Sequence, residues 1–157
     1  MNVVPLSGGW DSAFCLVRAI RAAGRENVLA VFVDYGQPYR AQERIAALSI
    51  ASALRVKLVC RRVPPIESQN GVFKDRNKTI LEIAAREGAS RIWFGCRNPF
   101  ALLDRFGDSN RRFAAGISRE LGVPISTPCL WLSKAVIRWA VQRGGVPASL
   151  VYSTEEA

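Results

Sequence analysis

Short apolar runs rich in β-branched residues alternate along this chain with longer stretches in which apolar residues recur every three or four positions. The runs are typical of strands buried on both faces of a parallel sheet, and the periodic stretches are typical of amphipathic helices. Strands are expected at residues 3–6, 28–33, 56–60, 91–95 and 123–127. Helices are expected at about residues 13–24, 39–54, 77–87, 108–121 and 134–143, the last of them capped by Ser133. This alternation predicts an α/β fold, a doubly wound and mostly parallel five-stranded sheet with helices on both faces.

The same pattern makes two finer predictions about the stretch that follows the second strand. In the helix at 39–54, the residues expected to face the core are Ile45, Leu48 and Ala51–Ala53. Those expected to face the solvent are Arg40, Gln42 and Glu43. Residues 64–74 show no periodicity and are expected to form a polar loop, a candidate for a mobile cover over a site.

In a doubly wound sheet, ligands bind beyond the carboxyl ends of the strands. Ser7, Asp34, Gly95 and Pro128 each follow an expected strand, and so does the loop after Cys60. These positions therefore fall on one edge of the sheet, which predicts a single ligand cleft there.

The composition suits a single domain over residues 1–157, because 49% of the residues are hydrophobic and the chain is long enough for a sizeable core. No apolar run is long enough to span a membrane, and no basic and apolar leader precedes Ser7, so a cytoplasmic location is expected. The four cysteines form no Cys-x-x-Cys pair and are expected to be reduced and mostly buried.

The formal net charge of +9 favours polyanions as ligands, whether ATP, pyrophosphate or nucleic acid. The arginines are spread along the chain without a basic block, so solvated helix faces explain them at least as well, and direct nucleic-acid binding is not favoured. The absence of histidine excludes Ser-His and Cys-His nucleophiles and removes the commonest zinc ligand. Chemistry must therefore rely on phosphate electrostatics, carboxylates, lysines or a thiol.

Residues 7–12, with the sequence SGGWDS, join the first expected strand to the first helix. The paired glycines let the backbone approach a ligand closely and the helix start directs N–H groups to the same place, so phosphate or pyrophosphate is the natural occupant. No Walker lysine follows, and the GxGxxG spacing is absent. An ordinary strand-to-helix turn with a serine cap is the structural alternative. The loop resembles the SGGxDS loop of the PP-loop ATP pyrophosphatases, which cleave ATP between its α and β phosphates.

Five motifs, in order along nearly the whole chain, resemble one branch of that family, the 7-cyano-7-deazaguanine synthases (QueC). They are SGGWDS (7–12), VDYGQPYRAQE (33–43), DRNKTILEIAA (75–85), FGDSNRRF (106–113) and TPCLWLSKAVI (127–137). The first motif is shared by PP-loop enzymes in general, whereas the second, third and fifth together are specific to this branch.

This resemblance implies an ATP-dependent carbon–nitrogen ligase. ATP would adenylate the carboxylate of 7-carboxy-7-deazaguanine, ammonia would displace AMP to give the amide, and a second activation would dehydrate the amide to 7-cyano-7-deazaguanine (preQ0). The product would serve 7-deazaguanine modification of tRNA or DNA. The expected partners are the deazapurine, ammonia and a second copy of the chain in a homodimer.

The resemblance also implies which residues bind ATP and Mg²⁺. The residues that would hold the leaving pyrophosphate are Ser7, Gly8, Gly9, Asp11 and Ser12. Asp11 would help to place Mg²⁺, or would cap the helix instead. Lys134 would direct its charge at phosphate, the alternative being a solvated helix lysine. The residues whose backbone would border the adenine or leave room beside the nucleotide are Val31, Phe32, Val33 and Gly95.

A further set of residues is implied at the deazapurine. These residues are Tyr35, Gln37, Arg76, Asn77 and Asp108. Asp108 would accept hydrogen bonds from the amino and ring N–H groups of deazaguanine, or would be a helix N-cap. Arg76 and Asn77 would grip phosphate or substrate, the alternative being a helix cap beside a surface arginine. The residues expected to be catalytic are Asp11, Ser12, Lys134 and Arg76.

Some positions depart from the family pattern. The histidine that follows GQ in the family is missing here, where Pro38 comes next, and the fourth motif has lost a cysteine and an arginine. Thr154 stands where the first of several zinc-binding cysteines is expected. With no histidine and no clustered cysteine, zinc is expected to be absent and Mg²⁺ to be the only bound metal. A divergent member that stops at the amide is left open.

Two other functions are also left open. One is a tRNA-modifying PP-loop enzyme of the thiolation or lysidine type. For that enzyme the positive charge would dock RNA, and Cys96 or Cys129, on the expected site edge, would supply a thiol. The other is a non-catalytic nucleotide-binding module.

Overall fold

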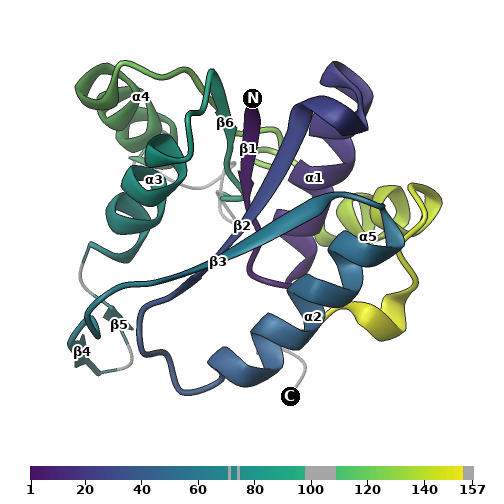
Figure 1. Ribbon diagram of the computed structural model, residues 1–157, viewed down its shortest axis with the longest axis horizontal. Coiled ribbons are helices and arrows are strands. Elements are labelled where there is room, and N and C mark those ends of the chain that lie inside the picture. Colours follow the sequence, from purple (N-terminus) through teal and green to yellow (C-terminus); the bar gives the residue numbers. More distant parts are fainter. Residues whose placement is uncertain (71, 74, 98–108, 154–157) are drawn as a thin grey trace.

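Five parallel strands form the central sheet of the structure, a computed structural model that describes residues 1–70, 72–73, 75–97 and 109–153 (Figure 1). The strands are β1 (Asn2–Pro5), β2 (Val28–Asp34), β3 (Lys57–Arg62), β6 (Arg91–Trp93) and β7 (Ile125–Ser126). Their spatial order is β3-β2-β1-β6-β7, and each neighbouring pair is parallel. The α/β fold and the five strands predicted from the sequence are confirmed.

Helices cover both faces of this sheet (Figure 1). On one face lie α1 (Trp10–Ala23), α2 (Arg40–Ala53) and α5 (Lys134–Arg143). On the other lie α3 (Arg76–Arg86) and α4 (Ser109–Leu121). Two short 3-10 helices are formed by Arg25–Asn27 and Ala148–Leu150. In the described ranges, no helix is both long and apolar enough to cross a membrane.

The alternation of side chains along the strands divides the core between the two faces. Val4 and Phe32 are buried with α1, α2 and α5, whereas Val3 and Val31 are buried with α3 and α4. β2 is buried except at Asp34, which is why its sequence is a continuous apolar run. Burial of a side chain as large as Phe32 stabilises the fold by about 1.5–3 kcal/mol.

The strand order places a topological switch point between β1 and β6. From β1 the chain passes to β2 and β3 on one side, and it later adds β6 and β7 on the other. The segments that leave β1 and β6 at their carboxyl ends therefore diverge, and a crevice forms between them. The 7–12 loop leaves β1 and Gly95 lies just after β6, so both segments border this crevice.

The predicted buried face of α2 is confirmed at Ala51 but wrong at Ile45 and Leu48. Ile45 is 65% exposed and Leu48 is 44% exposed, whereas Ala46 and Ala47 are buried. The cause is the loop that follows β1, since a Cβ on Gly8 would lie 2.7 Å from the Cβ of Ala46. Only small side chains fit at so close an approach, so Ala46 and Ala47 face the loop, whereas Ile50 is buried one turn further along α2.

The segment 64–74, predicted to lack regular structure, contains a small antiparallel hairpin of β4 (Ser68–Gln69) and β5 (Val72–Phe73). Each strand has only two residues, too few for a periodicity to appear in the sequence. Phe73 packs edge-to-face on Tyr35, with ring centroids 5.2 Å apart, and so joins the hairpin to the turn that follows β2.

Gly8 and Gly88 give a matched test of the contact between the loop and α2. Both have a positive φ, +88° and +79°, but an added Cβ would meet Ala46 and Glu43 at 2.7 Å at Gly8 and nothing within 4 Å at Gly88. We expect Gly88→Ala to lower the free energy of unfolding by about 1–2 kcal/mol, the backbone cost alone. Gly8→Ala should lower it by about 1–3 kcal/mol more, because of overpacking. Urea denaturation measures both, and equal losses would show that the loop does not depend on this contact.

Candidate active site

Two adjoining cavities lie at the carboxyl ends of the central strands, where the switch point predicts a ligand site. The first cavity has a volume of about 220 Å³ and lies between the 7–12 loop and α5. The second has a volume of about 350 Å³ and lies between the end of β2 and the start of α3. The residues that line both cavities are Ser7, Ser12, Glu43, Gly95 and Arg97. The two cavities therefore form one cleft.

Hydrogen bonds between its serines fix the shape of the 7–12 loop. The Ser12 hydroxyl accepts from the Ser7 backbone N–H at 3.2 Å, donates to the Gly9 carbonyl at 3.2 Å and lies 3.1 Å from the Ser7 hydroxyl. Gly9 is the N-cap of α1 and supplies no side-chain cap, so the first N–H groups of α1 keep no intrahelical partner. Because Gly9, Asp11 and Ser12 line the first cavity, this helix N-terminus is suited to binding an anion there.

Asp11 forms an ion pair with Arg97, with its Oδ2 3.4 Å from Nε. The alternative in which Asp11 caps the helix is wrong, because the N-cap is Gly9. Among the described residues, no group of three or more His, Cys, Asp or Glu side chains is placed to hold a metal ion. Mg²⁺ needs no such group, since it commonly takes one or two carboxylates together with phosphate oxygens and water. The Asp11 carboxylate, on the wall of the first cavity, fits that role.

The first cavity also carries positive charge. The cationic side chains that line it are Arg97, Lys134 and Arg138. Lys134 and Arg138 lie one turn apart on α5 and so on one face of the helix. As predicted, Ser133 caps this helix, its hydroxyl accepting from the Val136 backbone N–H at 3.3 Å. The Arg138 guanidinium lies over the Trp10 ring, 5.5 Å from its centroid. A helix N-terminus and three cations together suit a polyphosphate.

The second cavity combines apolar walls with polar groups. Val31, Phe32 and Val33, at the end of β2, line it together with Ile80 and Phe94. Apolar side chains beside the backbone groups of a strand end suit the face and edge of a flat heteroaromatic ring. The polar side chains that line this cavity away from the 7–12 loop include Tyr35, Gln37, Arg76, Asn77 and Asn110.

The side-chain amide of Gln37 forms hydrogen bonds within the protein, and the residue is only 1% exposed. Its Nε2 donates to the Val33 carbonyl at 3.2 Å and to Glu43 Oε2 at 2.9 Å. Its Oε1 accepts from the Tyr35 backbone N–H at 2.9 Å. Both amide hydrogens are therefore taken, and Gln37 positions the turn after β2 and the Glu43 carboxylate.

Glu43, predicted to face the solvent, lines both cavities instead. Burial raises the pKa of its carboxyl, while the hydrogen bond from Gln37 and the charge of Arg76 act in the opposite direction. The helical period could not reveal this position, because the loop that packs on α2 comes from elsewhere in the chain. Its place at the end of the 33–43 motif was the available signal. Other cavity residues that the sequence reasoning missed are Arg97, Arg138 and Tyr152.

The structure brings the predicted site residues together, with two exceptions. Gly8 packs against α2 and lines neither cavity. Asp108 lies outside the described residues. All the others line at least one of the two cavities, and their chemical roles stay predictions.

Packing against α1 requires a glycine at position 95, which also lines the cleft. A Cβ on it would lie 2.8 Å from the Asp11 carbonyl carbon and 2.9 Å from the Ser12 nitrogen. Gly95 is predicted to leave room beside the nucleotide. On the side where its Cβ would lie, that room is occupied by the first turn of α1.

The two thiols expected at the site differ in accessibility. Cys129 is fully buried, its Sγ 3.4 Å from the Asp11 carbonyl and 4.0 Å from the Cys15 Sγ. Cys96 lines the second cavity, but burial, with smaller effects of Cys129 and Asp11, raises its pKa to about 12. A thiol with such a pKa stays protonated near neutral pH and is a poor nucleophile, which weakens the sulfur-transfer alternative.

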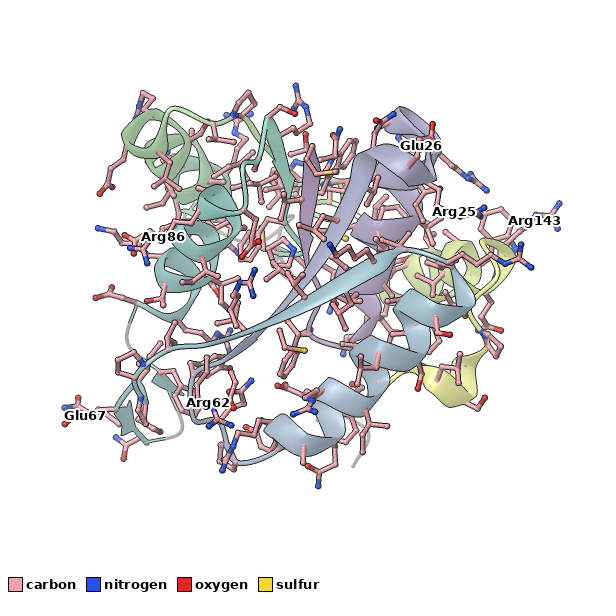
Figure 2. The ribbon with its side chains drawn as sticks, in the orientation of Figure 1. Arg25, Glu26, Arg62, Glu67, Arg86 and Arg143 are labelled. Carbon is pink, nitrogen blue, oxygen red and sulfur yellow. The ribbon has the colours of Figure 1, made fainter. Side chains whose placement is uncertain are left out.

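The positive charge outside the cleft is dispersed. Figure 2 shows Arg86 pointing outward on one side of the molecule and Arg25 and Arg143 on the opposite side. Charges distributed in this way keep a surface hydrated and do not by themselves mark a nucleic-acid interface.

The sheet order and the cleft at its switch point define a doubly wound α/β protein. Among solved structures, a predicted subunit of tRNA methyltransferase from Methanocaldococcus jannaschii shares the fold, with a TM-score of 0.63 and 19% sequence identity. The similarity covers 90% of this chain and 76% of that one. The family model described as queuosine biosynthesis protein QueC matches residues 1–103, and the chain belongs to this family.

Two curated proteins show the extent of the similarity. A 7-cyano-7-deazaguanine synthase from Koribacter versatilis is 44% identical over 55 residues, which are 35% of this chain and 23% of that protein. An NH3-dependent NAD+ synthetase from Chlorobium phaeovibrioides is 30% identical over 167 aligned positions, covering 95% of this chain and 54% of that protein. The chain thus spans about half, or less, of the length of these relatives.

Cysteine labelling tests the description of the thiols. Cys60 is exposed, whereas Cys15 and Cys129 are buried and the pKa of Cys96 is raised to about 12. At pH 8 we expect iodoacetamide to modify Cys60 first, with Cys96 reacting at least about tenfold more slowly and only faster as the pH rises, because the thiolate is the reactive form. Peptide mass spectrometry over time measures this order. Rapid labelling of Cys96 at pH 8 would contradict this description and support the sulfur-transfer alternative.

Proposed function

We propose that this chain catalyses the ATP-dependent conversion of 7-carboxy-7-deazaguanine and ammonia to 7-cyano-7-deazaguanine. The proposal depends on one observation in a chain of the QueC family, the single cleft. In this cleft, a cavity lined by cations and suited to phosphate adjoins a cavity with apolar walls that suit heteroaromatic rings. The names of the two curated relatives support it, one being a 7-cyano-7-deazaguanine synthase and the other an NH3-dependent synthetase.

In the first step, a carboxylate oxygen of the deazapurine attacks the α-phosphorus of ATP. The bond from that phosphorus to the bridging oxygen breaks, and pyrophosphate leaves with the electron pair. The N-terminus of α1, Lys134 and Arg138 line the cavity in which this charge develops, and their electrostatic stabilisation lowers the barrier. Mg²⁺, held by Asp11 and the phosphates, would supply further charge neutralisation.

The two ring systems belong to the second cavity in this proposal. The backbone of Val31, Phe32 and Val33, which line that cavity, borders the adenine. The side chains proposed to contact the deazapurine are Tyr35, Arg76, Asn77 and Asp108. Ammonia then attacks the acyl carbon and displaces AMP, and a second ATP activates the amide oxygen so that dehydration gives the nitrile.

The family also suggests how the product of the reaction is used. We propose that the product serves 7-deazaguanine modification of tRNA or DNA, in line with the description of the QueC family as queuosine biosynthesis proteins. We also propose that the protein acts as a homodimer. An enzyme that stops at the amide would use the same cleft and the same first activation.

Lys134→Ala and Lys57→Ala form a charge-matched test of the first cavity. Lys134 lines that cavity, whereas Lys57 is an exposed residue at the start of β3, outside both cavities of the cleft. We expect Lys134→Ala to reduce acid-dependent release of pyrophosphate about 100-fold, the usual cost of removing one group that stabilises developing charge. Lys57→Ala should leave the rate within twofold. Equal rates in both variants would remove α5 from the mechanism.

Product analysis tests the reaction itself. With 7-carboxy-7-deazaguanine, ATP, Mg²⁺ and ammonium, we expect mass spectrometry to find the amide and then the nitrile, with AMP and pyrophosphate as the nucleotide products. Accumulation of ADP would contradict cleavage between the α and β phosphates. Binding of ATP without any acid-dependent turnover would favour a non-catalytic module instead.

A further inference from the structure

Glu43 carries a carboxylate at the junction of the two cavities. Five residues line both cavities. Ser7 and Ser12 have hydroxyls that bond within the loop, and Gly95 has no side chain. Arg97 is a cation. In the part of the chain that the structure describes, the Glu43 carboxylate is therefore the one base at this junction.

The fold holds this carboxylate in a fixed place. Its Oε2 accepts a hydrogen bond from Gln37 Nε2 at 2.9 Å, and Gln37 is itself bonded to the backbone of Val33 and Tyr35. At the other end of the residue, the Glu43 carbonyl oxygen packs on Gly8, where a Cβ would lie 2.7 Å from it. A side chain constrained at both ends is suited to holding a small ligand in one position.

The Glu43 carboxylate is itself suited to a cationic or proton-donating ligand, because it accepts hydrogen bonds and protons. The cations around it suit the anionic substrates instead. The charged groups nearby are mostly cations, Arg76 from α3 and Lys134 and Arg138 from α5, while the carboxylate of Asp11 is paired with Arg97. ATP and a carboxylic acid substrate are both anions, so neither explains a second carboxylate between them. Burial raises the pKa of Glu43, which increases its affinity for a proton.

We propose that Glu43 forms the ammonium site of the reaction: its carboxylate binds ammonium between the two cavities and accepts the proton that must leave before the nitrogen can attack. This inference rests on the proposed function and adds a place for the nitrogen donor. The acyl carbon of the adenylated acid is joined to phosphate on one side and to the deazapurine on the other. It therefore lies where the two cavities meet, within the reach of a nucleophile held by Glu43.

The step balances with the groups present. Ammonium gives one proton to the Glu43 carboxylate, and the freed lone pair forms a C–N bond to the acyl carbon. The bond between that carbon and the phosphate oxygen then breaks, and its electron pair leaves with AMP. A second proton passes from the nitrogen to the departing phosphate, and Glu43 returns its own proton to water.

Hydroxylamine distinguishes proton acceptance from other roles, because it is mostly unprotonated at neutral pH and needs no base before it attacks. We expect Glu43→Gln to lower kcat/KM for ammonium by about 10²–10⁴-fold, the range of general base catalysis. With hydroxylamine the same variant should stay within about tenfold of the unmodified protein. Acid-dependent exchange of pyrophosphate into ATP, which needs no amine, should change by less than about threefold.

Two further variants serve as controls. Glu67→Gln removes an exposed carboxylate that points away from the molecule (Figure 2) and should leave all three measurements unchanged. Glu43→Asp keeps the carboxylate but withdraws it by one methylene, and should recover part of the ammonium reaction. A circular dichroism melt of each variant verifies that it is folded.

The outcomes separate this inference from the proposed function. Absence of acid-dependent exchange in the unmodified protein would overturn the proposed function and this inference with it. Normal exchange together with an unchanged ammonium dependence in Glu43→Gln would overturn the inference alone. So would a rise only in KM for the deazapurine acid, or a rise only in the Mg²⁺ requirement, because either would assign Glu43 to another ligand.

Discussion

Close contact of glycine backbone with its neighbours is the constraint on which the cleft depends. Gly8 touches the first turns of α2, and Gly95 touches the first turn of α1, both at distances that leave no room for a Cβ. These contacts bring α2 and the end of β6 to the 7–12 loop and hold the N-terminus of α1 at the switch point. The part of the cleft suited to an anion is thus built mainly from backbone, and serine hydroxyls fix its shape.

Apolar packing then places the charges around that backbone site. Ile137 and Val141 of α5 are fully buried in the same core cluster as α1, so α5 is fixed with Lys134 and Arg138 on the wall of the first cavity. On the opposite side, Gln37 turns Glu43 toward the junction of the cavities. The cleft therefore carries cations on the wall of the first cavity and the oriented Glu43 carboxylate at the junction of the two cavities.

The two cavities of the cleft differ in how specifically they indicate a substrate. An anion site at the start of α1 suits any nucleotide that gives up pyrophosphate, and the relatives include proteins named for deazaguanine and for NAD+ chemistry. The second cavity, with Tyr35, Arg76 and Asn77 on its wall, is where substrates would be told apart. Fold similarity alone does not choose between them, because function depends on such groups rather than on the sheet.

The sequence by itself determined the five strands, the Ser133 cap and the convergence of the 7–12 loop and Gly95 on one edge of the sheet. Local periodicity and the rule that parallel strands end on one edge are sufficient for these features. Only the tertiary structure decided that Ala46 rather than Ile45 is buried, that Gln37 is consumed by the protein, and that Glu43 faces the cleft. Each of these features depends on a contact with another segment, such as the loop around Gly8 or the end of β2. The periodicity of side chains along one helix contains no information about such a neighbour.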